Sequence, residues 1–423
     1  MKKILVISNN PFDLTQHNAK TILSLLGDKE LFSVRQIFLK DGSPGYKSAE
    51  YYRLTDREVL RSIVHPSNMA GSEVQPNKLS VESQNNNRTI KHSEISRFLR
   101  EILWNFGKID YERMFKWIER DGVDIIFFMG GDCCFAYDVF AHITEQYPNV
   151  PNVIYLTDDY ILPRNKFNIF LTIRRKMLLS KMMLSVPKAN LLITISEEMR
   201  KEYRRIFNKD SYVYANIPVE IRDMENQIND NSCVVGSKNY TLSYTGGLHY
   251  NRWKVLRKLG LAIQKYNVIN NTHIVLNIYA PLKPSNRVLS KLNIENGSCF
   301  CGALNSGQVE DVLIKSDSLV FVECFDKKSI ASTRLSFSTK IYEYLSYKKP
   351  VLAIGPDMVS SIKFLTQCAY CITNYKKISP EELNIFFLKE KQNQVAAECF
   401  NMFMSKYNDD FGKQKIVDTL LSL

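Results

Sequence analysis

The sequence lacks the features of a membrane-spanning or secreted chain. Its 423 residues contain no apolar run that approaches the ~20 residues needed to cross a bilayer. The apolar run Ile4–Ile7 follows a basic N-terminus, but Asn9, Asn10 and Pro11 end it well before the length of a signal peptide. This run is better interpreted as a first buried β-strand, and we expect a cytoplasmic protein.

The sequence also lacks the grouped ligands of a structural metal site. Nine cysteines are scattered along the chain. Two close pairs, Cys299 with Cys301 and Cys368 with Cys371, have neither a second matching pair nor histidine partners, which a structural zinc site requires. No convincing Asp-x-Asp metal motif is present either. We expect reduced, structural cysteines and no metal, with a redox or metal role as the alternative.

Positive charge, by contrast, is in excess, with a formal net charge of +12. Such an excess favours an anionic partner, which can be nucleic acid, anionic lipid or a phosphorylated substrate. The segment between Tyr160 and Ser196 contains seven basic residues and no acidic one. Aliphatic side chains separate these residues where a nucleic-acid surface would present stacking aromatics, so we do not expect a nucleic-acid partner.

The same basic segment has the composition of an amphipathic helix that lies on an anionic membrane surface. Its membrane-surface candidates are Arg174, Arg175, Lys176 and Lys181. In that case the protein is peripheral on the inner face of the cell membrane. The alternative is a half-buried helix with a solvated basic face.

Continuous apolar runs alternate with helical patterns in both halves of the chain. This alternation predicts an α/β fold with parallel sheets covered by helices on both faces. In the first half, strands are expected at Ile4–Ile7, Phe32–Leu39, Val123–Met129, Val153–Leu156 and Leu191–Ile195, with helices at His17–Leu26 and within Glu94–Glu119. In the second half, strands are expected at Thr241–Tyr244, Ile274–Tyr279, Ser318–Val322 and Val351–Ile354, with a helix at Trp253–Lys265.

The length of the chain and a polar stretch at Asp223–Tyr240 indicate two domains joined by a linker. We predict a Rossmann-like N-terminal domain at 1–222, a Rossmann-like C-terminal domain at 223–395, and a C-terminal helix at 396–423 that packs back on the first domain. Ligands bind at the carboxyl ends of strands in such sheets, so the expected active site is a cleft between the halves. A second polar stretch, His65–His92, is either a surface insertion or a lid.

The most informative stretch is Leu335–Pro356, LSFSTKIYEYLSYKKPVLAIGP. Ser338, Thr339 and Lys340 stand where its helix begins, and hydroxyls, free backbone N–H groups and a lysine in that place can hold a phosphate or diphosphate. Glu343 lies on the same helix face one turn further along. A carboxylate does not favour phosphate, so we expect it to hold hydroxyls such as those of a ribose. A diphosphate beside a ribose indicates a nucleotide-sugar.

A second group opens the second half, in LSYTGGLHYNRW. Gly246 and Gly247 let the backbone approach a ligand closely, and Arg252 at the start of the next helix can fork onto phosphate oxygens. The group is a weak signal alone, because its loop is not the GxGxxG of dinucleotide-binding folds. Beside the Ser338–Glu343 group it is stronger.

The order of these motifs resembles the donor-binding domain of GT-B glycosyltransferases, most closely family 4 and its bacterial polysaccharide branches. The segments that carry the resemblance are YTGGLHYNRW, IYAP, FCGAL, SDSLVFVE and FSTKIYEYLSYKKPVLAIGP, and LLITISEEMRKEY before the linker is similar too. The resemblance covers roughly residues 190–360 well and the rest by architecture only.

The resemblance implies roles for individual residues. Arg252 and Lys340 would bind the donor diphosphate, the turn at Gly246–Gly247 would approach it, and Glu343 would hold the ribose. The family's first glutamate lies eight positions before Glu343, where this chain has Leu335, so the donor sugar and the retaining outcome stay open. The basic residues would also neutralise the leaving nucleoside diphosphate, a role that replaces a metal, so no cofactor is expected.

Acceptor-side residues are expected in the first half. Asp158 and Asp159 follow a buried strand, and one of them can orient or deprotonate an acceptor hydroxyl; the alternative is a turn that caps the next helix. His17, just after the first strand–helix loop, is a further candidate base, with a structural histidine as the alternative. Gly130–Asp132 and Asn9–Asn10 are expected to line the cleft.

These observations predict a glycosyltransferase that moves a hexosyl or related sugar from a nucleotide-sugar donor to a polysaccharide or lipid-linked oligosaccharide acceptor, in cell-surface polysaccharide synthesis. One alternative is a nucleotide-sugar epimerase of the same architecture, which needs further acid/base groups that we do not find. The other is a non-catalytic, nucleotide-sugar-binding scaffold subunit, which the missing glutamate at Leu335 keeps open.

Overall fold

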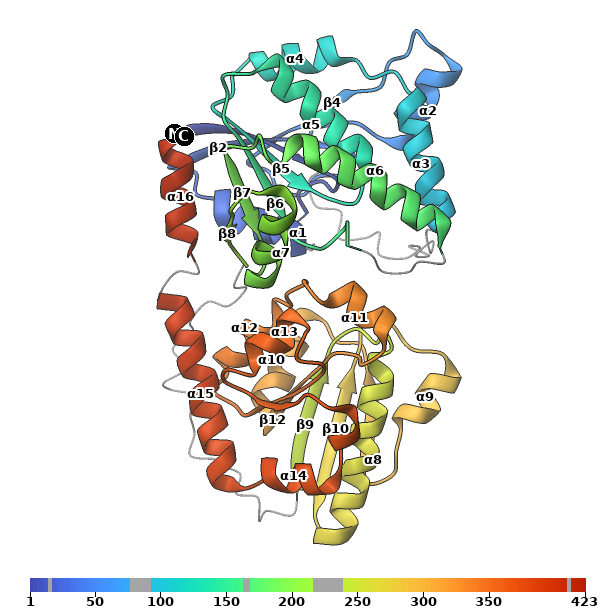
Figure 1. The fold of residues 1–423 in the computed structure, drawn as a ribbon, viewed down its shortest axis with the longest axis vertical. Coiled ribbons are helices and arrows are strands. Elements are labelled where there is room, and N and C mark those ends of the chain that lie inside the picture. Colours follow the sequence, from blue (N-terminus) through green and yellow to red (C-terminus); the bar gives the residue numbers. More distant parts are fainter. Residues whose placement is uncertain (14–16, 77–92, 163–167, 216–238, 409–411) are drawn as a thin grey trace. The chain divides into compact units, whose positions relative to one another are not determined.

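The computed structural model describes the whole chain except residues 14–16, 77–92, 163–167, 216–238 and 409–411. The chain forms two compact units, each with its own sheet and core (Figure 1). Unit 1 comprises Met1–Asn216 and Phe411–Leu423, and unit 2 comprises Ile217–Asp410. The predicted linker at Asp223–Tyr240 lies outside the described residues except for Asn239 and Tyr240, which begin the first strand of unit 2.

Unit 1 contains an eight-stranded sheet in the order β4-β3-β2-β1-β5-β6-β7-β8. Neighbouring strands pair in parallel, except that β4 runs antiparallel to β3. Its strands are β1 (Lys2–Ser8), β2 (Phe32–Phe38), β3 (Glu50–Arg53), β4 (Ser72–Val74), β5 (Ile125–Gly130), β6 (Asn152–Leu156), β7 (Leu191–Thr194) and β8 (Tyr212–Val213). Its helices are α1 (His17–Leu26), α2 (Asp56–Val64), α3 (Glu94–Phe106), α4 (Tyr111–Glu119), α5 (Cys134–Gln146), α6 (Ile169–Ser185), α7 (Glu197–Phe207) and α16 (Lys413–Ser422).

Unit 2 contains a six-stranded parallel sheet in the order β11-β10-β9-β12-β13-β14. Its strands are β9 (Asn239–Thr245), β10 (His273–Tyr279), β11 (Ser298–Gly302), β12 (Ser318–Val322), β13 (Val351–Ile354) and β14 (Tyr370–Ile372). Its helices are α8 (Arg252–Asn270), α9 (Asn286–Leu292), α10 (Ser306–Lys315), α11 (Lys327–Thr333), α12 (Lys340–Ser346), α13 (Ser360–Leu365), α14 (Pro380–Phe386) and α15 (Lys389–Asn408), with a short 3₁₀ turn at Tyr375–Lys377.

Helices cover the sheet of unit 2 on both faces, as the continuous apolar strands predict. Successive side chains of a strand point to opposite faces. On β13, Leu352 and Ile354 join one hydrophobic core, whereas Val351 and Ala353 join another on the other face. The predicted α/β fold of two Rossmann-like halves is therefore confirmed.

The structure adds detail to two expectations about the first half. The pattern in Glu94–Glu119 forms two helices, because α3 ends before Gly107 and α4 starts only after Asp110 caps it. The polar stretch His65–His92 contains the short edge strand β4, and its residues 77–92 lie outside the described part of the chain.

The C-terminal segment 396–423 spans parts of two helices that belong to different units. Helix α15 packs on α12 and α14 in unit 2. Helix α16 packs on α1, and its Ile416, Val417 and Leu420 join the core of unit 1. Among the described residues, no helix is both long and apolar enough to cross a membrane.

Both sheets reverse their direction of growth next to their first strand. The chain places β1 between β2 and β5, and β9 between β10 and β12. In open α/β sheets, ligands bind outside the carboxyl ends of the strands at such a switch point. The two switch points are therefore the places in which to look for functional side chains.

Candidate functional site

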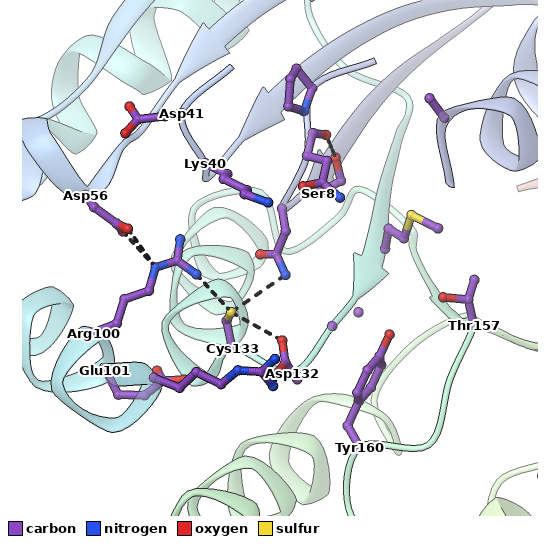
Figure 2. A pocket seen from close by; sticks show the side chains of 18 of the residues that line it. Ser8, Lys40, Asp41, Asp56, Arg100, Glu101, Asp132, Cys133, Thr157 and Tyr160 are labelled. Atoms are coloured by element: carbon purple, nitrogen blue, oxygen red, sulfur yellow. Dashed lines mark hydrogen bonds and ion pairs between the residues drawn. The ribbon is translucent and has the colours of Figure 1, made fainter. Parts of the chain in front are cut away.

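A cavity of about 450 Å³ lies at the switch point of unit 1 (Figure 2). Loops that follow β1, β2, β5 and β6 line it, together with side chains of α3 and α6. Its wall includes both strand-end groups that the sequence predicts to line a cleft, Asn9–Asn10 and Gly130–Asp132. The charged residues of the wall are Lys40, Asp41, Asp56, Arg97, Arg100, Glu101, Asp132 and Arg174.

Most of these charges are engaged with one another. The Nε atom of Arg100 lies 2.8 Å from Oδ1 of Asp56, and its Nη2 donates to the Leu39 carbonyl at 3.0 Å. The carboxylate of Asp132 lies 3.0 Å from Arg97 and 3.3 Å from Arg174. The wall thus balances four cations against four carboxylates. Such a surface suits a ligand whose groups both donate and accept hydrogen bonds, as saccharide hydroxyls do.

Glu101 reaches from α3 to the start of α5. Its carboxylate accepts the backbone N–H of Cys134 at 3.0 Å and that of Phe135 at 3.3 Å. The N-cap residue Cys133 makes no side-chain cap bond, so Glu101 satisfies N–H groups that the helix itself leaves open. Burial raises the pKa of Glu101, although these two N–H groups and Arg174 oppose the rise.

Cys133 and Asn9 meet at the floor of the cavity. The amide of Asn9 lies 3.7 Å from the Cys133 sulfur, and Nη1 of Arg100 lies 3.4 Å from it. Burial raises the pKa of the Cys133 thiol, which therefore stays protonated and is a poor nucleophile. The Oδ1 atom of Asn9 is buried and has no hydrogen-bond partner among the described residues, so a ligand hydroxyl there would satisfy it.

The predicted acceptor-side carboxylates lie next to this cavity rather than in its wall, which Thr157 and Tyr160 line instead. Asp159 is only 1% exposed, and its Oδ1 accepts the backbone N–H groups of Ile161 and Leu162 at 3.1 Å each. The Tyr203 hydroxyl also donates to this oxygen, at 3.1 Å. This is the environment of a carboxylate that holds a turn.

Two other predicted bases are less informative. Asp158 accepts the backbone N–H of Asp159 at 2.8 Å, which is again a contact within the turn. His17 begins α1, but its side chain lies outside the described part of the structure.

Arg252 and Glu323 form a buried ion pair at the switch point of unit 2. Glu323 directly follows β12, and its Oε1 lies 2.7 Å from Nη2 of Arg252 at the start of α8. The side chains are 16% and 4% exposed. The Nη1 atom of Arg252 lies 3.1 Å from Nε2 of His249. Because an arginine can only donate, His249 accepts there as a neutral ring, in keeping with a pKa lowered by burial and by Arg252.

Lys340 and Tyr344, both on α12, hold the end of β9. The Lys340 ammonium donates to the Thr245 carbonyl at 2.5 Å, and the Tyr344 hydroxyl lies 2.9 Å from the Thr245 hydroxyl. Burial lowers the pKa of Lys340, Glu343 opposes this, and Arg252 adds to it. Burial raises the pKa of Glu343, which Lys340 opposes. Glu343 and Arg252 both influence the pKa of Lys340, which itself bonds to the end of β9, so we treat the three side chains as one cluster.

The loops around this cluster are tight. A Cβ atom on Gly246 would stand 2.6 Å from the Tyr244 hydroxyl, and one on Gly247 would collide with Nδ1 of the His249 ring, so a larger residue at either position would have to displace that side chain. Ser338 donates its backbone N–H to Ser361 at 3.2 Å, and Thr339 is the N-cap of α12 without a side-chain cap bond. Since α12 has only seven residues, the charge of Lys340 matters more here than the helix dipole.

Leu335, where the resemblance expects a glutamate, is buried and only 7% exposed. Sequence reasoning gave no role to Glu323, although a carboxylate at the end of the apolar strand β12 is a signal of its own. It also missed Arg97, Arg100 and Glu101, whose spacing on one face of α3 is a usable signal.

The predicted membrane-surface residues do not share one exposed face of α6. Arg174 is 5% exposed and donates to the Asp132 carbonyl at 2.5 Å. Arg175 is 7% exposed and donates to the Tyr160 carbonyl at 3.0 Å. For these two residues the prediction is wrong, because their guanidinium groups bond inside unit 1.

The remaining basic residues of that prediction are mixed. Lys176 is exposed, and Lys181 is half-exposed and pairs with Asp138. Arg164 and Lys166 lie outside the described residues. In the described part of the chain, no group of three His, Cys, Asp or Glu side chains is placed to hold a metal ion.

No protein-family model and no curated protein matches the sequence. Solved structures resemble it over its whole length. A trehalose-6-phosphate protein from E. coli bound with UDP-2-fluoro glucose is 12% identical, with a TM-score of 0.59 and 100% of this chain and 99% of that chain covered. Anabaena Alr3699/HepE in complex with UDP and glucose is 14% identical, with a TM-score of 0.59 and both chains covered completely.

The N-terminal domain of Candida albicans trehalose-6-phosphate phosphatase is also similar, at 12% identity and a TM-score of 0.59, with 100% of this chain and 97% of that chain covered. At this level of identity the likeness shows the fold alone. The fold is that of the GT-B glycosyltransferases, which agrees with the resemblance of the motifs.

Proposed function

We propose that the protein is a glycosyltransferase of the family 4 type that takes its sugar from a nucleotide-sugar donor. The observation that carries the proposal is the cluster of Arg252, Lys340 and Glu343 at the switch point of unit 2. Its two cations suit a diphosphate, and its carboxylate suits the two hydroxyls of a ribose. Stabilisation of the leaving nucleoside diphosphate by these cations needs no metal ion.

The acceptor is proposed to bind in the cavity of unit 1. A saccharide fits its balanced charges and the unpaired amide oxygen of Asn9. Following the motif resemblance, we extend the proposal to a polysaccharide or lipid-linked oligosaccharide acceptor, met at the cytoplasmic face of the membrane during cell-surface polysaccharide synthesis. The resemblance implies transfer with retention, which Leu335 in place of the family's glutamate leaves open and which NMR of the product anomer would test.

Donor binding is the first test. In a thermal-shift and calorimetric screen of nucleoside diphosphates and their sugars, we expect the compounds of one nucleobase to bind. Such binding is detected as a rise in melting temperature, because a ligand that binds only the folded form raises its stability. Lys340→Ala and Glu343→Ala should each weaken that binding about tenfold or more, the loss expected for one charge-assisted hydrogen bond. The matched controls are Lys328→Ala and Glu390→Ala, which change exposed residues elsewhere in unit 2.

Two outcomes would contradict the proposal. Donor affinity that is unchanged in both cluster variants would remove the assigned site. Donor binding without hydrolysis or transfer to any saccharide acceptor would instead favour the non-catalytic scaffold, which the buried Leu335 in place of a glutamate keeps in view.

A further inference from the structure

Helix α3 turns its charged side chains inward and its apolar side chains outward. Arg100 and Glu101 lie on the inner side, where Arg100 bonds to Asp56 (Figure 2) and Glu101 bonds to the start of α5. The outer side carries Ile95, Leu99, Ile102 and Phe106, which are 50%, 57%, 38% and 69% exposed. Their spacing places all four on one stripe of the helix. A helix that faced water would have the opposite polarity.

Helix α6 is inverted in the same way. Arg174 and Arg175 are buried, whereas Ile169, Ile173 and Leu184 are 69%, 41% and 62% exposed. These three residues also follow a helical stripe, in which Lys176 is the charged member. The predicted membrane-surface helix therefore presents the opposite side from the one that the sequence suggested.

The inverted helices are neighbours. Helix α3 packs against both α2 and α6 at one end of unit 1 (Figure 1), and the Phe98 and Phe170 rings lie 5.6 Å apart between α3 and α6. Helix α2 adds Leu60, Ile63 and Val64, which are also exposed. We call the exposed apolar side chains of α2, α3 and α6 the apolar face. Patches of this kind on a soluble protein mark a surface that binds something other than water.

The exposed charges of these three helices are mostly positive. Arg57, Arg61 and Lys176 are exposed. Every carboxylate of the three helices is engaged instead: Asp56 pairs with Arg100, Glu58 with Arg53, Glu94 with Arg174, and Glu101 bonds to the start of α5. Arg57 lies 3.6 Å from Asp41 in the loop after β2, so the positive charge beside the apolar face rests mainly on Arg61 and Lys176, and it is complementary to an anionic surface.

We propose that the apolar face of α2, α3 and α6 docks unit 1 on the surface of an anionic lipid bilayer. Apolar side chains would enter the boundary of headgroups and acyl chains, and the cations would meet lipid phosphates. A second copy of the chain is a poorer occupant, because a symmetric contact brings the same cations face to face. The inference goes beyond the proposed function, because docking needs neither donor nor acceptor.

The test is co-sedimentation of the full chain with vesicles made of equal parts of phosphatidylcholine and phosphatidylglycerol. Wild type should bind, and Leu99→Ser/Phe106→Ser/Ile169→Ser should bind about tenfold more weakly or worse. The matched control is Val268→Ser/Ile269→Ser on α8 in unit 2, whose side chains are 73% and 69% exposed and whose loss should change nothing. Circular dichroism and donor affinity check that the triple variant is folded.

A second pair of variants tests the charge. Arg57→Gln/Arg61→Gln/Lys176→Gln should weaken binding to the anionic vesicles and flatten its salt dependence, whereas Lys201→Gln/Arg205→Gln on α7 should not. The proposal is overturned if wild type does not bind these vesicles, or if the serine variant binds as well as wild type. It is overturned too if light scattering finds a wild-type dimer that the serine variant dissociates.

Discussion

Unit 1 and unit 2 reverse their strand order at equivalent points of their sheets. They differ in how far apart along the chain the side chains at those points are. In unit 2, Arg252 and Glu323 each follow a central strand directly or within one loop, and Lys340 and Glu343 belong to one short helix. In unit 1, the pair of Asp56 and Arg100 joins α2 to α3, and contacts of Asp132 bring in α6 as well.

The two units also neutralise their buried carboxylates differently. Glu323 in unit 2 is hydrogen-bonded to Arg252, whereas Glu101 in unit 1 accepts the N–H groups of α5 and lies 3.9 Å from Arg174. The comparison teaches that one topology can support a site assembled locally, which we propose for the donor, and a pocket assembled from distant helices, which we propose for the acceptor. If the proposed roles are right, damage to one site should leave ligand binding at the other intact.

The largest expected effect tests the arginine pair of unit 2. Arg252→Met leaves the buried Glu323 carboxylate without its guanidinium, which should lower the free energy of unfolding by about 3–5 kcal/mol. The double variant Arg252→Met/Glu323→Gln should recover most of that loss, because no unpaired charge is left behind. Urea unfolding followed by circular dichroism gives both free energies.

The same double variant separates stability from binding. If Arg252 forks onto the donor diphosphate, the double variant should be stable and still bind donor poorly. If the double variant is no more stable than Arg252→Met, the unpaired charge of Glu323 is not the cause of the lost stability. If the double variant binds donor as tightly as wild type, Arg252 is not part of the donor site.

A smaller effect is expected for the pocket of unit 1. Asp132→Asn weakens the contacts with Arg97 and Arg174, and should raise the acceptor KM about tenfold, as for one hydrogen bond to a charged group. The donor affinity should not change, since Asp132 lies in the other unit. Steady-state kinetics with varied acceptor, and calorimetry with donor, measure the two quantities.

The control is Asp138→Asn, which changes an aspartate of the same unit that pairs with Lys181 and does not line the cavity. Its acceptor KM should equal that of wild type. If Asp132→Asn changes the donor affinity and leaves the acceptor KM unchanged, the roles assigned to the two units are reversed.

This difference in assembly explains what could be predicted from the sequence. The strands of both units follow from continuous apolar runs, and the cluster at Lys340 and Glu343 follows from a contiguous motif. The partner of Arg252 is 71 residues away, and nothing local announces it. The pocket of unit 1 depends on contacts such as that between Asp56 and Arg100, 44 residues apart, which only the packed helices create.

The orientation of α6 could not be predicted from amino-acid composition, for a related reason. A run of basic and aliphatic residues has two possible inner sides, and the tertiary partners decide between them. Here Asp132 and Tyr160 accept bonds from Arg174 and Arg175, so the arginines turn inward and Ile169 and Ile173 turn outward. Sequence reasoning identified the segment but not its exposed side.

The smallest expected effect concerns the carboxylate of unit 1. Burial raises the pKa of Glu101 above that of an unfolded glutamate, so the folded chain binds its proton more tightly. Its contribution to stability should therefore fall as the pH rises from the ordinary carboxyl pKa through the raised one. Glu101→Gln should remove that fall, which is seen as a free-energy difference between wild type and variant that changes with pH.

The measurement needs a signal from unit 1 alone. Of the three tryptophans, Trp104 and Trp117 lie in unit 1 and Trp253 in unit 2, so urea unfolding of Trp253→Phe followed by fluorescence reports on unit 1. Wild type should lose stability relative to Glu101→Gln as the pH rises. A gain instead would mean that the N–H groups of α5 and Arg174 outweigh burial and hold Glu101 as a charge. Glu101 would then differ from Glu323 of unit 2, because burial raises the pKa of Glu323 although Arg252 opposes the rise.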